Sequence, residues 1–277
     1  KMGCTDSRSD LTEQEIIITQ HEGVLGFGSN SVVQTDYILR KFSHQGMLNP
    51  TQFNDACKHL KLTCPGSSSA ICALYNLIKV DSENYSLRNL LLLGVLLSYG
   101  SSADKARILF EIYDDTCLHC LDAYTVKQMV EELYQVTVLQ LPIIAISQDA
   151  AERSKVLGYI EQIKYRGGRG KEKLAAAFME GNTKLTQSAF IEFLSRDNNV
   201  RYLFSWGIRD FLFKIYQQVP SSRHIQATHV EHVERFPTVR SSLKKSRSKS
   251  ALRVKFAESL VTSTYILSAS ESETKSV

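Results

Sequence analysis

The sequence of 277 residues predicts an all-α protein. Apolar residues recur at helical spacing, as they do between Ala106 and Tyr113, and the alternation typical of strands is scarce. An apolar fraction of 43% suits a folded core. Composition divides the chain into an N-terminal arm (1–10), a helical body (11–219) and a Ser-rich basic tail (220–277). We expect the tail to be disordered, because it holds few large apolar residues.

Local signals place the helices of the body. Pro50 suits a first helical turn, where its missing N–H needs no partner. Ser86 and Ser102 are good N-caps for the segments that follow them. The longest apolar run, Leu90–Leu97, is too short to span a bilayer and predicts a buried helix. The expected helices cover 36–42, a stretch opening at Pro50, 87–98, 103–113, 123–135, 150–164, 171–180, 187–195 and 199–217.

Several function classes find no support in the residues. The chain carries no nucleophile elbow, kinase signature or paired catalytic carboxylates, so we expect no enzyme. Cys117 and Cys120 form a lone C-x-x-C without a second pair, so we expect packed thiols and no metal site. No secretory signal is expected from the first residues, which indicates a cytoplasmic protein with reduced cysteines. Arg166–Lys171 is expected to be a basic loop between helices, and no nucleic-acid partner is expected.

The N-terminal arm carries a lipidation pattern. From Met2 the chain matches M-G-x-x-x-[ST], the N-myristoylation signal, with Gly3 as the acceptor. Cys4 is placed for a palmitoyl chain, and two acyl chains give stable membrane attachment where one does not. Lys1 precedes Met2, so the signal acts only if Gly3 becomes the terminal residue. The alternative is an unmodified, flexible terminus.

One stretch of the body resembles a known family. Lys105–Leu133 has a lysine-led helix with an aromatic ending, a loop, and a second helix with a hydrophobic beginning. The residues that carry this pattern are Phe110, Tyr113, Asp114, Leu121 and Val126. The stretch resembles an EF-hand of the calcineurin-B and neuronal-calcium-sensor superfamily. Weaker units align around 36–60 and 171–194, and the resemblance implies paired helix–loop–helix units over about 11–217.

The loops depart from the calcium-binding pattern. The 114–125 loop offers the oxygen-bearing side chains of Asp114, Thr116, Asp122 and Thr125. Leu118 stands at a ligand position, and Thr125 replaces the bidentate Glu that closes a calcium loop. The loops at 41–52 and 178–189 have fewer ligands still. We therefore expect weak or inactive calcium sites and no cofactor.

The resemblance also implies a binding role, because paired helices of this family form a groove for an amphipathic helix of a partner protein. A non-catalytic adaptor or scaffold, tethered to a membrane by its acylated arm, is the function expected first. The alternatives are a structural or auxiliary subunit of a channel or of a cytoskeletal assembly such as a ciliary microtubule, and a calcium sensor. The plain alternative for the apolar positions is that they form only an internal core.

The tail holds a second short motif. Between Arg240 and Lys255 there are seven Lys or Arg residues and no acid. The tetrapeptide Arg253-Val254-Lys255-Phe256 resembles the RVxF motif that docks on type-1 protein phosphatase, in which alternate side chains enter apolar pockets. A solvated basic tail, a lipid-binding tail and a microtubule-binding tail are the alternatives.

Charge and serines suggest how the tail acts. Residues 220–277 hold 10 Lys or Arg and 5 Asp or Glu, whereas the remainder holds 23 and 24. The basic excess is therefore a property of the tail, which favours an anionic membrane surface or protein partner. Three serines among the basic residues are expected to be targets of basophilic kinases, and phosphates there would weaken lipid binding. They are Ser246, Ser248 and Ser250.

Overall fold

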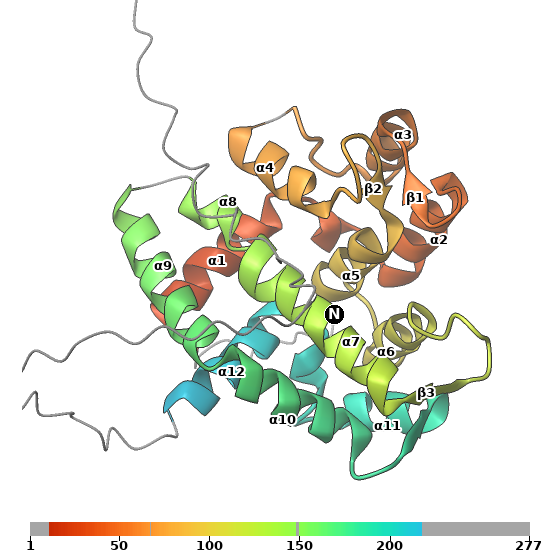
Figure 1. Cartoon of the computed structure of the whole chain (residues 1–277). Helices are drawn as coiled ribbons and strands as arrows, with labels where there is room; N and C mark the ends of the chain where they lie inside the picture. The colour runs from red at the N-terminus through yellow and green to blue at the C-terminus, as the bar shows by residue number, and fades with distance from the viewer. Residues whose placement is uncertain (1–10, 67, 148–149, 218–277) are drawn as a thin grey trace, which may run out of the picture. The chain divides into compact units, whose positions relative to one another are not determined.

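The computed structural model describes residues 11–66, 68–147 and 150–217 (Figure 1). This part is mostly helical, which confirms the all-α class. The lipidation, phosphatase-docking and phosphorylation predictions lie outside the described residues. Those residues are Gly3, Cys4, Ser246, Ser248, Ser250, Arg253, Val254, Lys255 and Phe256.

The first half contains two helix–loop–helix units. Its elements are α1 (Glu13–Gly23), a 3-10 turn η1 (Phe27–Ser29), α2 (Val32–Phe42), β1 (Met47–Leu48), α3 (Pro50–Leu60), α4 (Ser69–Ile78), β2 (Tyr85–Ser86) and α5 (Leu87–Leu97). The strands β1 and β2 pair antiparallel, with Leu48 opposite Tyr85. One short pair thus joins α2–β1–α3 to α4–β2–α5.

The second half repeats this arrangement with an insertion. Its elements are α6 (Ser102–Glu111), β3 (Cys120–Asp122), α7 (Ala123–Tyr134), a π-helical segment η2 (Gln135–Gln140), α8 (Ile143–Ile146), α9 (Ala150–Tyr165), α10 (Gly167–Met179), β4 (Lys184–Thr186), α11 (Gln187–Ser195), a 3-10 turn η3 (Val200–Leu203) and α12 (Ser205–Gln217). Strands β3 and β4 pair antiparallel, with Leu121 opposite Leu185. The segment η2–α8–α9 separates the two units.

Side-chain caps explain where many helices begin. Pro50 is the first residue of α3, and Asn49 and Gln52 cap that helix reciprocally, with two N–H···O distances of 2.9 Å. Ser86 caps α5 by accepting from the N–H of Asn89. Both predictions are confirmed. The cap of α6 is Ser101, one residue before the predicted Ser102.

Three sequence predictions were wrong or incomplete. Helix α4 was missed, although Ser68 caps it and most of its residues are apolar. Arg166–Lys171 is not a loop, since α10 begins at Gly167. The predicted helix 199–217 breaks at Phe204, whose extended backbone separates η3 from α12. The break lets Gly207 approach Arg201, whose carbonyl oxygen would lie 2.1 Å from any Cβ there.

The core runs through both halves and includes the insertion. Val136, Val138, Leu141 and Ile144 are buried, where η2 and α8 contact α4, α5, α9 and α12 (Figure 1). The stretch Ala123–Ile146 is long and apolar enough to cross a membrane by length and composition alone. However, 61% of its most apolar window is buried in the protein, as in a core helix.

Candidate functional site

The 114–125 loop brings together only part of the predicted ligand set. The Asp114 carboxylate accepts the backbone N–H of Leu118 at 3.1 Å and that of His119 at 2.9 Å. Thr116 lies beside it, with Oγ1 3.5 Å from Oδ1 of Asp114. Cys117 and His119 both have positive φ, which turns the loop around the carboxylate. Asp114 therefore organises the loop through its own backbone.

The other two predicted residues of this loop act at the start of α7. Asp122 is the N-cap of that helix and accepts the Thr125 N–H at 2.8 Å. These backbone hydrogen bonds hold the pKa of Asp122 below its usual range. Across the described ranges, no group of three or more His, Cys, Asp or Glu side chains is placed to hold a metal ion. Cys117 is exposed and Cys120 is half-buried, both as free thiols.

The remaining loops have other shapes. Lys41 and Phe178, the first positions of the 41–52 and 178–189 loops, still lie inside α2 and α10. Glu180 and Gly181 turn the second of these loops tightly, both with positive φ. The α4–α5 loop was missed in the sequence, although Asp81 is followed by polar residues and by the Ser86 cap. Its carboxylate accepts the N–H groups of Glu83 and Asn84.

A cavity of about 660 Å³ lies between the two halves of the described chain. The β1 loop and the start of α5 form one wall, and the end of α6 with α7 and η2 forms the other. Met47, Leu91 and Ile112 supply apolar surface, while Glu132 and Gln135 supply polar groups. Such a mixed lining suits an amphipathic segment better than a purely apolar ligand.

Arg88 is one of two arginines that line this cavity, the other being Arg40. The Arg88 guanidinium lies 3.2 Å from Asp115 and 3.5 Å from Glu132 and sits 5.2 Å from the centre of the Tyr113 ring. Tyr113 in turn donates its hydroxyl to Glu132 at 2.8 Å. Burial and the neighbouring Glu132 charge raise the pKa of Tyr113. The cluster ties α5 to α7 and to the segment that follows α6, at the wall of the cavity.

A buried ion network joins the first and last helices of the described chain. Arg209 of α12 is fully buried and contacts Glu15 and Glu22 of α1, each at 2.8 Å. Tyr159 donates to Glu15, and Ser205 donates to Glu22, both at 2.7 Å. Burial raises the pKa of Glu22 even against the pull of Arg209. In the sequence, Glu15 and Glu22 occupy positions on the apolar face around Ile18, which is the signal that could have revealed them.

The same arginine satisfies a carbonyl left free by the π-helix. In η2 the Leu141 N–H reaches back to the Val136 carbonyl, one residue further than in an α-helix. By this pattern the Thr137 carbonyl would pair with residue 142, but Pro142 has no N–H. Nη1 of Arg209 donates to that oxygen at 3.0 Å. The network therefore also fixes the central apolar helix.

A buried lysine stands apart from these ion pairs. Nζ of Lys105 lies 3.4 Å from the Leu203 carbonyl and 4.0 Å from the centre of the Phe204 ring. No carboxylate lies within ion-pairing distance of it among the described residues. Burial lowers the pKa of Lys105 to about 7.

Comparison of the sequence with protein-family models and with curated proteins finds no match.

Proposed function

We propose that this protein is a non-catalytic EF-hand-like adaptor or scaffold. The observation that carries the proposal is the repeated joining of helix–loop–helix units by short antiparallel pairs, Leu48 with Tyr85 and Leu121 with Leu185. Paired units are what the resemblance of Lys105–Leu133 implies. The incomplete ligand set around Asp114 favours a protein-binding role over calcium sensing.

The partner is proposed to be an amphipathic helix bound at the 660 Å³ cavity. The chain's own η2, α8 and α12 contact the helices of both paired units, and the cavity is a surface that the described residues leave open for a partner. Arg88 and Glu132 at its wall would select polar groups on that helix, and Met47 and Leu91 would contact its apolar side.

A photo-crosslinking experiment tests this site. A benzophenone side chain is introduced at Asn89, which lines the cavity, and in a control at exposed Tyr124, which does not. We expect cells expressing the Asn89 variant to yield a crosslinked partner that the Tyr124 variant lacks, with the crosslink mapping to an apolar–polar helix. Equal products from both positions would contradict the proposed site.

Membrane tethering and phosphatase recruitment belong to the arm and the tail. Acylation of Gly3 and Cys4 is tested by mass spectrometry of the native N-terminus, and an unmodified Met-Gly start would remove the tether.

Phosphatase docking is tested by recovery of type-1 phosphatase on V254A/F256A, with F236A/V239A as a control that truncates the same residue types. We expect loss of recovery only for the first variant, and equal recovery by all chains would exclude docking.

A further inference from the structure

The junction of α9 and α10 concentrates positive charge on one outer corner of the described chain. Between Glu161 and Lys173 there are five Lys or Arg and two Glu residues. Lys164 pairs with Glu161 and Lys171 pairs with Glu131. No carboxylate within the described ranges pairs with Arg166, Arg169 or Lys173. The corner therefore keeps uncompensated cations, although the chain outside the tail is nearly neutral.

Backbone packing fixes which side chains face outward. Only Arg166 separates the two helices. A Cβ at Gly167 would lie 2.7 Å from the Tyr134 hydroxyl, and one at Gly170 would lie 2.5 Å from Leu212. These glycines hold the start of α10 against α7 and α12. Arg169, on the opposite side of the turn, is consequently left exposed.

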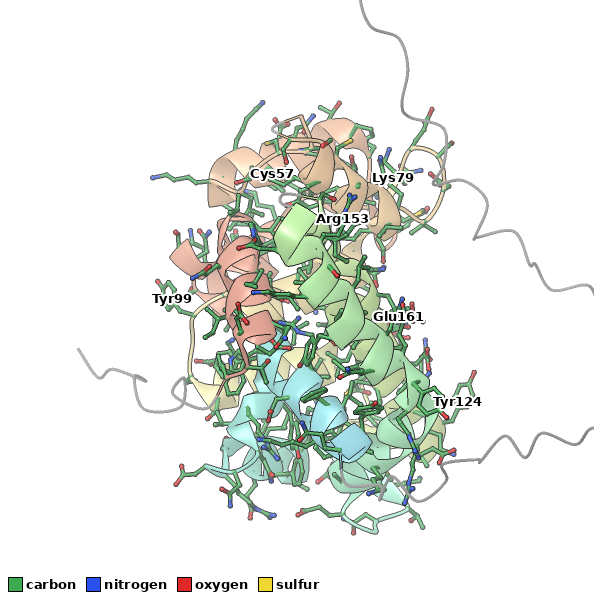
Figure 2. All side chains as sticks on the ribbon, turned by 90° about the vertical axis from the view of Figure 1, so that its left-hand side faces the viewer. Cys57, Lys79, Tyr99, Tyr124, Arg153 and Glu161 are labelled. Atoms are coloured by element: carbon green, nitrogen blue, oxygen red, sulfur yellow. The ribbon has the colours of Figure 1, made fainter. Side chains whose placement is uncertain are left out.

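An aromatic side chain stands at the tip of this corner. Tyr165 is 78% exposed, and the Arg166 guanidinium lies 5.4 Å from the centre of its ring. Exposed tyrosine beside arginine and lysine is the composition of membrane–water interfaces, where the ring lies at the headgroup level. In Figure 2, α9 runs along the face toward the viewer, from Arg153 past Glu161 toward this corner.

We propose that the α9–α10 corner, residues 164–173, is a membrane-contact surface that binds anionic lipid headgroups. Charge complementarity identifies the partner: clustered Lys and Arg residues are attracted to the negative surface of the cytoplasmic leaflet. None of the residues of this corner lines the 660 Å³ cavity. The inference rests on the membrane association in the proposed function but not on acylation of the arm.

Vesicle binding of the full chain, produced without acyl groups, tests the proposal. The variant is R169Q/K173Q, and the control is K41Q/K58Q, which removes the same charge from exposed positions on α2 and α3. With phosphatidylserine-containing vesicles we expect the first variant to bind about 30-fold more weakly, from about fivefold per charge. The control should bind like the wild type, and no chain should bind phosphatidylcholine vesicles.

A second background, in which four tail cations are replaced by Gln, distinguishes lipid binding by the corner from lipid binding by the tail. The four cations are Lys244, Lys245, Arg247 and Lys249. R169Q/K173Q should weaken binding by a similar factor in this background. Equal losses of vesicle affinity for R169Q/K173Q and K41Q/K58Q would mean that only net charge matters, and would overturn the proposal. Binding of R169Q/K173Q as tight as that of the wild type would also overturn it. An unmodified native N-terminus would remove the tether without changing these results.

Discussion

Replacing Arg209 by Met should strongly destabilise the protein. Met keeps an apolar stem of similar reach but removes every N–H that contacts Glu15, Glu22 and the Thr137 carbonyl. Arg209 is fully buried, and the two carboxylates are at most 4% exposed. Breaking a buried pair from one side costs about 3–5 kcal/mol, because the remaining charges lose their partner without gaining water.

The expected loss is measurable by urea and thermal unfolding followed by circular dichroism at neutral pH. For a chain of this size each kcal/mol lowers the midpoint by about 2–4 °C, so R209M should unfold about 6–20 °C earlier. The triple variant E15L/E22L/R209M removes all three charges together and should recover most of the loss, since apolar replacements of whole buried networks are often neutral.

Two results would refute this reasoning. A midpoint for R209M within about 2 °C of the wild type would mean that the network contributes less than about 1 kcal/mol. A triple variant less stable than R209M would mean that the carboxylates stabilise the fold by themselves. If R209M does not fold, the triple variant alone still tests whether unpaired charge is the cause.

Three further predictions follow from the same contacts. Burial lowers the pKa of Lys105 to about 7, so the free-energy cost of burying its charge is fully present below pH 7 and is relieved as pH rises toward the pKa of an unfolded lysine. K105M should therefore be more stable than the wild type at pH 7, and it should lose the gain in stability that the wild type shows above pH 7. The raised pKa of Glu22 makes wild-type stability fall as pH rises above the unfolded pKa of a glutamate, and E22Q, measured by urea unfolding across that range, should lose this slope. The variant L118D/H119G/T125E supplies the missing loop ligands and the glycine turn, so calorimetry should detect tighter calcium binding by the variant than by the wild type. Heat changes equal to those of the wild type would show that the loop around Asp114 differs from a calcium loop in more than its ligands.

Sequence reasoning succeeded where short-range rules decide the structure. Pro50 and Ser86 act within one helical turn, and their effects are confirmed. The structure places Leu48, Leu121 and Leu185 in short strands between helices. Local capping and apolar spacing are visible in any window of the chain.

Sequence reasoning failed where contacts between residues far apart in the chain determine the structure. Arg209 and Glu15 are 194 positions apart, so no window of sequence shows that one compensates the other. The start of α10 looks like a glycine-rich loop until Tyr134 and Leu212 explain why Gly167 and Gly170 are needed in a helix. The cavity depends on the placement of α5 against α6 and α7, which periodicity does not encode.

The network between α1 and α12 also constrains the order in which the helices can be buried during synthesis. A chain is synthesised from its N-terminus at about 5–20 residues per second, so about 10–40 s pass between the appearance of Glu15 and that of Arg209. During this interval the two carboxylates of α1 have no cation to join, and burying α1 early would be costly. We therefore expect α1 to stay at the surface of the growing chain until α12 has been synthesised.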